Sequence, residues 1–322
     1  MKGNPMTLDS HPLKNRLNKN LKRLKTYLTK GGIEAYRLYH KDIPEFPYLI
    51  DIYGDHVVIY EQGKKLGDDE DGLREKHQQE ISEVLKDAGY STGQQHFKIR
   101  ERQKGASQYN LIKEDSHQYF NVQEPPFKFL VNPERYLDTG LFLDMRPLRQ
   151  HLFKTCKDKD VLNLFCYTGS LSVASAAGEA TRVVSVDMSR TYLDWAEENF
   201  RLNDMDPDKY EFKQADAIKE LERLKEAHEK FDIIILDPPS FSNSKRMEED
   251  LDVQRDHPIL VRDCMLLLQL DGVLYFSTNK KKFELHHIIS EKFAVKEISQ
   301  WTIPMDFHHT QIHRAFEIRH KH

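Results

Sequence analysis

Two short segments of the sequence combine residue types that can bind a nucleoside and place a planar polar group beside it. The first, residues 164–170, ends in Thr-Gly-Ser and is followed about 20 residues later by Asp187. A glycine turn lets a ligand approach the backbone because glycine lacks a Cβ. An acid at this spacing can accept hydrogen bonds from ribose hydroxyls. The second segment, residues 237–241, reads Asp-Pro-Pro-Ser-Phe.

The first segment differs from the glycine-rich loops that bind phosphates. A dinucleotide fingerprint requires G-x-G-x-x-G and a phosphate loop requires G-x-x-x-x-G-K-[ST], whereas this turn holds only Gly169. We therefore predict a nucleoside cofactor without phosphates, and S-adenosylmethionine fits that description. The alternative is an ordinary strand–helix–strand unit of a doubly wound domain.

The second segment is stiff, because its two prolines fix the backbone and leave carbonyl groups free to accept hydrogen bonds. Phe241 is an aromatic plate that can stack on a nucleobase. We therefore predict that Asp237, Pro238, Pro239 and Phe241 are the catalytic residues, which hold the reacting group beside the cofactor. A turn with a purely structural role is the alternative.

Both segments follow short apolar runs that are typical of strands buried on both faces. Such runs occupy residues 161–165, 183–186, 231–236 and 272–277. Parallel sheets bind ligands outside the carboxyl ends of their strands, so Gly169, Asp187 and Asp237 should share one edge. Because helical patterns alternate with the runs, we predict an α/β fold over residues 126–322, a Rossmann-like sheet with helices on both faces.

Residues around the glycine turn and at neighbouring strand ends are predicted to hold the cofactor. Asp216 follows a strand at 210–214 and can accept a hydrogen bond from the adenine amino group. Upstream, Arg146 can pair with the cofactor carboxylate or with Asp144. The predicted cofactor-binding set is Asp144, Arg146, Asn163, Phe165, Tyr167, Thr168, Gly169, Ser170, Asp187, Met188, Ser189, Asp216 and Asp237.

Residues 1–125 are predicted to form a smaller α+β domain that ends at a Pro-Pro pair and binds RNA. Residues 11–30 hold lysines and arginines, no acid, and leucines at helical spacing, which predicts an amphipathic basic helix. The basic face of this helix can be an ordinary solvent-exposed surface. Alternatively, it can be a surface that binds the phosphates of RNA. Over the whole chain, the predicted RNA-binding residues are Lys14, Lys22, Arg23, Arg100, Arg102, Lys104, Lys245, Arg246, Lys280 and Lys281.

Composition sets broad limits on the class of protein. A length of 322 residues allows two domains, and no run approaches the ~20 apolar residues of a membrane helix. A net charge of −4 predicts no nucleic-acid partner from bulk electrostatics, so RNA contact must rely on local basic patches. The three scattered cysteines and the histidine cluster at 308–313 lack the spacing of metal ligands, so we predict no metal. The three cysteines are also too few for a disulfide framework, and we predict a cytoplasmic location.

The two chemical segments resemble motifs I and IV of class I S-adenosylmethionine-dependent RNA methyltransferases. Longer stretches resemble the RlmK-type 23S rRNA guanine-N7 methyltransferases, known as one half of a bacterial fusion protein with two methyltransferase domains. These stretches are residues 15–20, 36–39, 100–105, 136–144, 186–199, 241–247 and 252–257. The resemblance therefore covers nearly the whole chain.

The resemblance implies an RNA-binding N-terminal domain and methyl transfer to a guanine in helix 74 of 23S rRNA, either naked or in a pre-50S particle. Phe241 would stack on the guanine, and the lysines at 280–282 would hold phosphates. The sequence holds no counterpart of the second half of the fusion protein, which methylates guanine N2.

Three alternative functions remain open at this stage. RNA cytosine-C5 methylation requires a cysteine nucleophile, which in relatives lies after the fifth strand, where this sequence reads Ser-Thr-Asn-Lys at 277–280. A non-catalytic ribosome-assembly factor would not need Gly169, Asp187 and Asp237. A small-molecule methyltransferase would not need the basic patches.

Overall fold

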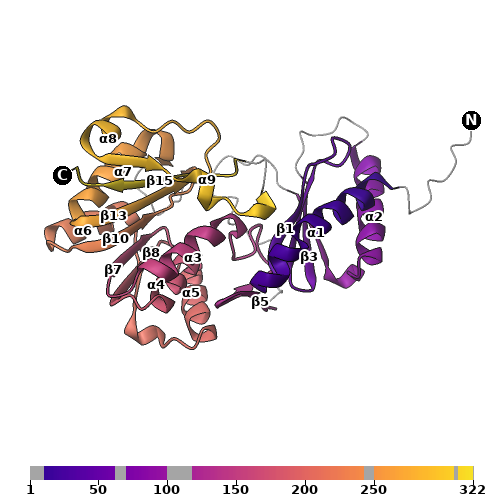
Figure 1. Ribbon diagram of the computed structural model, residues 1–322, viewed down its shortest axis with the longest axis horizontal. Helices are drawn as coiled ribbons and strands as arrows, with labels where there is room; N and C mark the ends of the chain where they lie inside the picture. Colours follow the sequence, from indigo (N-terminus) through magenta and orange to yellow (C-terminus); the bar gives the residue numbers. More distant parts are fainter. Residues whose placement is uncertain (1–10, 62–69, 100–117, 243–249, 308–310, 322) are drawn as a thin grey trace, which may run out of the picture. The chain divides into compact units, whose positions relative to one another are not determined.

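The computed structural model describes residues 11–61, 70–99, 118–242, 250–307 and 311–321. The chain separates into two compact units, Met1–Pro126 with Val131–Thr139, and Phe127–Leu130 with Gly140–His322 (Figure 1). The predicted RNA-binding residues Arg100, Arg102, Lys104, Lys245 and Arg246 lie outside the described residues. In the described part of the chain, no helix has both the length and the apolar composition needed to cross a bilayer.

The first unit is a four-stranded sheet with helices. Its elements are α1 (Pro12–Gly31), β1 (Ala35–His40), β2 (Tyr48–Tyr53), β3 (His56–Glu61), α2 (Glu70–Asp87), η2 (Thr92–Gln94), β4 (Gln95–Ile99) and β5 (Phe120–Glu124). The sheet order is β1-β2-β3-β4, antiparallel except for the parallel β3–β4 pair.

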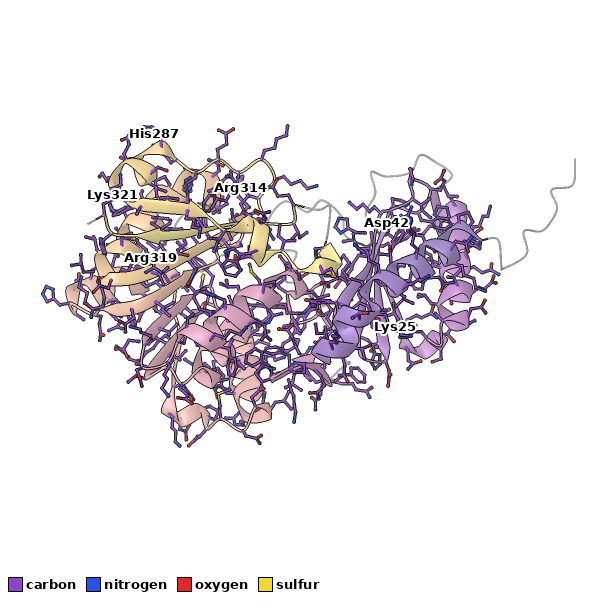
Figure 2. All side chains as sticks on the ribbon, viewed as in Figure 1. Lys25, Asp42, His287, Arg314, Arg319 and Lys321 are labelled. Atoms are coloured by element: carbon purple, nitrogen blue, oxygen red, sulfur yellow. The ribbon has the colours of Figure 1, made fainter. Side chains whose placement is uncertain are left out.

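Helix α1 confirms the amphipathic helix predicted for residues 11–30. Its leucines Leu13, Leu17 and Leu24 are buried in one core with the strands, because residues three or four apart share a helix face. Gly32 ends the helix in a left-handed conformation, with φ of 60°, and its N–H bonds the last carbonyls. The lysines therefore remain on the outer side, where Lys25 projects from α1 (Figure 2).

The second unit is built on a seven-stranded sheet with the order β14-β15-β13-β10-β7-β8-β9. Its strands are β7 (Asp160–Leu164), β8 (Arg182–Asp187), β9 (Glu211–Gln214), β10 (Phe231–Leu236), β13 (Leu268–Thr278), β14 (Ala294–Glu297) and β15 (Arg314–Arg319). The five strands from β13 to β9 run parallel, and β15 and β14 are antiparallel at one edge. A β6 strand (Phe127–Val131) precedes them in the chain, and β11 (Phe241–Ser242) pairs with β12 (Leu251–Asp252).

Helices cover both faces of this sheet, which confirms the predicted α/β fold (Figure 1). They are α3 (Arg146–Thr155), α4 (Ser170–Ala177), α5 (Arg190–Leu202), α6 (Ala217–Glu226), α7 (Val253–Leu267), α8 (His287–Lys292) and α9 (Ser299–Thr302), with the short turns η4 (Leu143–Met145), η5 (Pro207–Lys209) and η6 (Met305–Phe307). Helix α4 contacts α3 and α5, and helix α7 contacts α6 and α8.

The central strands are buried because their apolar side chains point to both faces. Ile234, Leu162 and Val184 are register partners and lie in a core cluster on one face. The adjacent row, Ile233, Val161 and Val183, points to the opposite face and is also buried. Each such side chain contributes roughly 1.5–3 kcal/mol on burial. The apolar runs of the sequence thus fix the sheet, and the sheet fixes where its strand ends lie.

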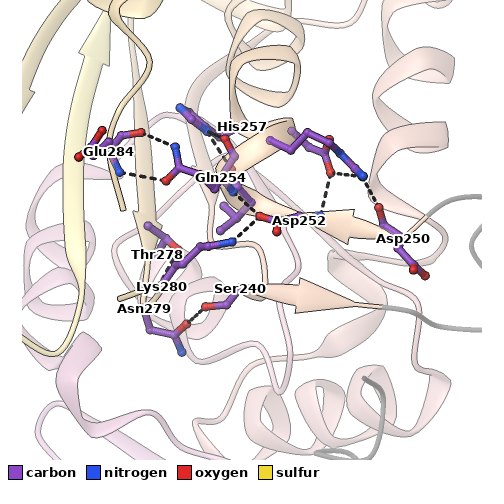
Figure 3. A network of polar contacts seen from close by, with 12 residues as sticks. Ser240, Asp250, Asp252, Gln254, His257, Thr278, Asn279, Lys280 and Glu284 are labelled. Carbon is purple, nitrogen blue, oxygen red and sulfur yellow. Dashed lines mark hydrogen bonds and ion pairs between the residues drawn. The ribbon is translucent and has the colours of Figure 1, made fainter. Parts of the chain in front are cut away.

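The sequence pattern predicts a helix over residues 283–293 and a closing hairpin of residues 294–303 with 312–318. The helix begins instead at His287, because the Gln254 side chain bonds both the N–H and the carbonyl of Glu284 (Figure 3). The hairpin forms, since β14 pairs antiparallel with β15, but its first strand ends at Glu297 and gives way to α9.

Candidate active site

The carboxyl ends of β7, β8 and β10 lie level with one another. The register pairs Leu164 with Val186 on one side and with Leu236 on the other. The glycine turn after β7, Asp187 at the end of β8 and the Asp-Pro-Pro turn after β10 therefore meet at one edge of the sheet. Asp216 joins this edge, since β9 pairs with β8 and Ala215 donates its N–H to the carbonyl of Asp187.

The loop after β7 has an unusual backbone. Phe165, Tyr167 and Gly169 all have φ between 52° and 71°, in the left-handed region. For residues with side chains this conformation is costly, and it clusters at ligand-binding sites. A Cβ at Gly169 would lie 2.7 Å from the Cβ of Ala196 on α5, so only glycine fits there. The loop is therefore held in one shape close to α5.

Two hydrogen bonds to Thr168 fix the loop from outside. Its hydroxyl donates to the carbonyl of Gly140 at 2.6 Å, and its carbonyl accepts from Asn199 Nδ2 at 2.9 Å. The Tyr167 ring contacts the rings of Phe142 and Tyr192. Thr168 and Tyr167 thus shape the loop through their contacts within the protein.

Asp187 combines a half-buried carboxyl with backbone donors. One oxygen accepts from Tyr167 N at 3.0 Å and the other from Ser189 N at 2.9 Å. Burial nevertheless raises the pKa of Asp187 to about 6. Each carboxylate oxygen keeps further acceptor capacity, which suits two ribose hydroxyls. Ser189 also caps α5, accepting from Tyr192 N.

Asp237 is the second carboxyl with a raised pKa at this edge. Burial raises its pKa to about 6 and the nearby Asp144 adds to the rise, against a hydrogen bond from Ser277 and the charge of His313. Ser277 Oγ donates to Asp237 Oδ1 at 2.7 Å. Asp144 contacts His313 Nδ1 at 2.8 Å, so two carboxyls and an imidazole share this part of the site.

His313 contributes to this part of the site, although the sequence places it only in a histidine cluster without metal-site spacing. Its Nε2 lies 2.9 Å from the Thr302 hydroxyl, and its Nδ1 contacts Asp144. Within the described ranges, no group of three or more histidine, cysteine, aspartate or glutamate side chains is placed to hold a metal. No local sequence pattern marks His313, because its partner Asp144 is 169 positions away.

Arg146 is buried and pairs with Asp306 at 2.8 Å, a partner that no local sequence pattern indicates. Asn163 lies in the core, where its Nδ2 donates to Ser172 Oγ. Asp216 caps α6 by accepting from Ile218 N at 2.8 Å. Arg146 and Asn163 thus have structural partners, whereas Asp187, Asp216 and Asp237 lie at the open strand ends.

The remaining predicted cofactor residues frame the same edge. Ser170 begins α4, and its hydroxyl lies 3.4 Å from the Arg149 guanidinium. The carbonyl of Met188 accepts from Gln214. The predicted set therefore divides into residues on the glycine turn, residues at strand ends and residues in the core.

The Asp-Pro-Pro turn leads directly to an exposed aromatic side chain. Phe241 is 40% exposed and stands on the short β11–β12 pair. Lys280 bonds Asp252 on β12 at 2.5 Å, so its charge is neutralised within the protein (Figure 3). Lys281 and Lys22 are exposed, Arg23 is partly buried, and Lys14 pairs with Asp87 at 2.9 Å.

The groups at this edge fit a nucleoside that carries a positive charge. Asp187 offers acceptors for ribose hydroxyls, and ionised Asp237 would favour a cation nearby. Gly169 supplies backbone without a Cβ for close approach.

Comparison with known proteins gives a consistent result. A family model described as S-adenosylmethionine-dependent methyltransferase matches residues 68–297. The chain is 44% identical to the ribosomal RNA large subunit methyltransferase K of Neisseria meningitidis serogroup B, over 98% of this chain and 89% of that protein. It is 43% identical to the K/L methyltransferase of Marinobacter nauticus over 96% of this chain, but spans only 43% of that longer protein.

Solved structures resemble the fold at lower identity. The methyltransferase SMU.776, crystallised with SAH, has a TM-score of 0.77 and 23% identity, covering 98% of this chain and 83% of the other. A SAM-dependent methyltransferase from Streptococcus mutans gives a TM-score of 0.75 at 23% identity, covering 98% and 82%. At this identity the likeness concerns the fold alone.

Proposed function

This chain belongs to the family of S-adenosylmethionine-dependent methyltransferases, which confirms the cofactor expected from the sequence, and we propose that it methylates N7 of a guanine in 23S ribosomal RNA. The observation that carries the proposal is the 44% identity to a ribosomal RNA large subunit methyltransferase K over nearly the full length of both proteins. The finer target, a guanine in the helix 74 region, rests on the resemblance of the sequence motifs.

The chemistry asks little of the protein beyond positioning. When bound, S-adenosylmethionine supplies an electrophilic methyl group on a sulfonium. Guanine N7 already carries a lone pair, so no general base is needed, and alignment of the two reactants is the main contribution. In the proposed roles, Asp187 accepts from the ribose hydroxyls and Asp216 from the adenine edge.

Two groups at the strand ends suit the target base. Phe241, 40% exposed after the rigid proline pair, would stack on a guanine taken out of its helix. Methylation at N7 leaves a positive charge on the base. Ionised Asp237, fixed by Ser277, would stabilise that developing charge through electrostatic attraction.

Cysteine burial disfavours cytosine-C5 chemistry. The thiols Cys156, Cys166 and Cys264 are all buried, and burial raises the pKa of each, for Cys156 to about 11. A nucleophile must be reachable and partly ionised, and these thiols are neither.

We propose that residues 1–125 bind RNA and that residues 126–322 carry the transfer. The proposed partner is 23S rRNA, naked or within a pre-50S particle, which would place the enzyme in the cytoplasm. The basic outer face of α1 and exposed Lys281 are the described features that support RNA contact.

In vitro methylation tests the proposal. The purified full chain is incubated with methyl-labelled S-adenosylmethionine and 23S rRNA, either free or in pre-50S particles, and the modified base is mapped. We expect one N7-methylguanine, retained when all three cysteines are replaced by serine. Label on a cytosine, or on no RNA under any condition, would contradict the proposal.

A further inference from the structure

A hydrogen bond joins the two loops that face the proposed target base. Ser240 belongs to the Asp-Pro-Pro-Ser-Phe turn after β10, and Asn279 follows β13, the next strand in the sheet. Ser240 Oγ donates to Asn279 Oδ1 at 2.6 Å (Figure 3). Ser240 directly precedes Phe241 in the chain, so the bond ties Asn279 to the loop that carries the aromatic side chain.

The bond orients the Asn279 amide. Because Oδ1 accepts from Ser240, the Nδ2 group points to the other side of the amide, with two N–H donors. Asn279 is exposed, and among the described residues its Nδ2 donates to none. These loops therefore present a neutral, oriented donor at Asn279, which is bonded to the residue that precedes Phe241.

Lys280, the cation next to Asn279, is engaged within the protein and does not compete with Asn279 for an acceptor on the target base. Lys280 Nζ bonds Asp252 Oδ1 at 2.5 Å, and its backbone N–H donates to the Thr278 hydroxyl. Asp252 is itself fixed as the cap of α7. Of these two neighbouring residues, Asn279 is therefore the one whose side-chain donor remains available to a base stacked on Phe241.

We propose that Asn279 Nδ2 donates to O6 of the target guanine and so selects guanine over adenine. This inference rests on the proposed function. Guanine carries an acceptor at position 6, whereas adenine carries an amino donor there, which would oppose the Asn279 donor. A single donor to O6 also leaves the N7 lone pair free to react. Asn279 is therefore a specificity-determining residue.

The test measures discrimination at position 6 of the base. The modified guanine is first mapped in 23S rRNA with the wild-type enzyme. Synthetic RNAs of that sequence then carry guanine or 2-aminopurine, which lacks O6 but keeps N7, at the mapped position. Methyl transfer is measured as kcat/KM for both RNAs with wild type and with Asn279→Ala. The N1 change in 2-aminopurine is common to both enzymes, so their comparison isolates the Asn279 contact.

We expect the wild-type preference for guanine to shrink about 3- to 10-fold in Asn279→Ala, the range for one neutral hydrogen bond. The loss should fall on the guanine RNA alone. Ser240→Ala, which releases the amide, should shrink the preference roughly twofold. The exposed neighbour provides the control, because Lys281→Ala should slow both RNAs by the same factor.

Distinct outcomes separate the two proposals. If the wild type methylates a guanine but Asn279→Ala and Ser240→Ala keep the full preference, the role of Asn279 is wrong and the function stands. If the wild type methylates no guanine, the function fails and the inference with it. Calorimetric binding of S-adenosylmethionine by each variant shows that it is folded.

Discussion

At the scale of single residues, the two raised carboxyl pKa values link cofactor binding to pH. Burial raises the pKa of Asp187 and of Asp237 to about 6, so both acids begin to take up protons just below neutral pH. Protonated Asp187 loses acceptor capacity for the ribose, and protonated Asp237 loses its charge. S-adenosylhomocysteine lacks the sulfonium charge, so as a probe it responds mainly to Asp187.

We predict that affinity for S-adenosylhomocysteine is flat above about pH 7 and falls about fivefold between about pH 6 and about pH 5. The direction follows from the raised pKa of Asp187, because only the ionised carboxylate serves both ribose hydroxyls. Calorimetric titration over this pH range measures the effect. In Asp187→Asn the affinity should be lower and no longer depend on pH.

Asp194→Asn serves as the control, because Asp194 is exposed on α5 and pairs with Arg190. It should keep the wild-type affinity and pH profile. An Asp187→Asn variant with the wild-type pH profile would show that Asp187 does not contact the cofactor.

At the scale of elements, helix α5 sets the shape of the cofactor loop. Its Ala196 lies where a Cβ of Gly169 would be, and its Asn199 bonds the Thr168 carbonyl. Trp195 packs so closely on Gly140 that a Cβ there would lie 2.1 Å from the indole ring. Gly140 in turn accepts the Thr168 hydroxyl. One helix thus holds the loop through contacts at both of its sides.

We predict that Gly140→Ala lowers the free energy of unfolding by about 2 to 6 kcal/mol. The added methyl group meets the Trp195 ring, and φ of 98° strains any residue except glycine. Denaturant unfolding measures the loss. Gly93→Ala is the matched control, since no heavy atom lies within 4 Å of its Cβ position, and it should change stability by less than about 0.5 kcal/mol. Equal stability of the two variants would contradict this account of the packing.

The buried pair between Arg146, at the start of α3, and Asp306 in η6 offers a second prediction at this scale. Asp306→Ala should lower the free energy of unfolding by about 3 to 5 kcal/mol, because it removes the carboxylate that pairs with a buried guanidinium. The double variant Arg146→Met with Asp306→Leu should recover most of that loss. Urea unfolding of the single and double variants measures the coupling, and a double variant as unstable as Asp306→Ala would refute it.

What the sequence could predict follows from how far each interaction reaches. The strands, most of the helices and the edge shared by Gly169, Asp187 and Asp237 follow from local periodicity and from the rule for parallel strand ends. The partners Asp306 and His313 lie 160 and 169 positions from Arg146 and Asp144, beyond any local pattern. For Asn163 the local pattern indicates a cofactor contact near the end of β7, but its side chain bonds Ser172 on α4 and is buried in the core.

At the scale of the whole molecule, charge must be distributed unevenly if the protein binds RNA. The net charge is −4, so phosphate contacts depend on local groups such as the basic face of α1. On that helix, Lys14 is paired with Asp87 at 2.9 Å, whereas Lys22 is exposed. The two lysines therefore form a matched pair that separates a neutralised charge from an available one.

We predict that the affinity of the full chain for a labelled helix 74 RNA falls as salt rises from about 50 to about 200 mM, because bound phosphates release counterions. The logarithm of the binding constant should fall linearly with the logarithm of the salt concentration. Lys22→Ala should reduce the slope by about 1, the contribution of one phosphate contact. Lys14→Ala should change it less, since Asp87 already neutralises that lysine. Fluorescence anisotropy titrations measure the three slopes. Affinity independent of salt would instead point to a small-molecule substrate, and equal slopes for Lys22→Ala and wild type would remove α1 from the RNA-binding surface.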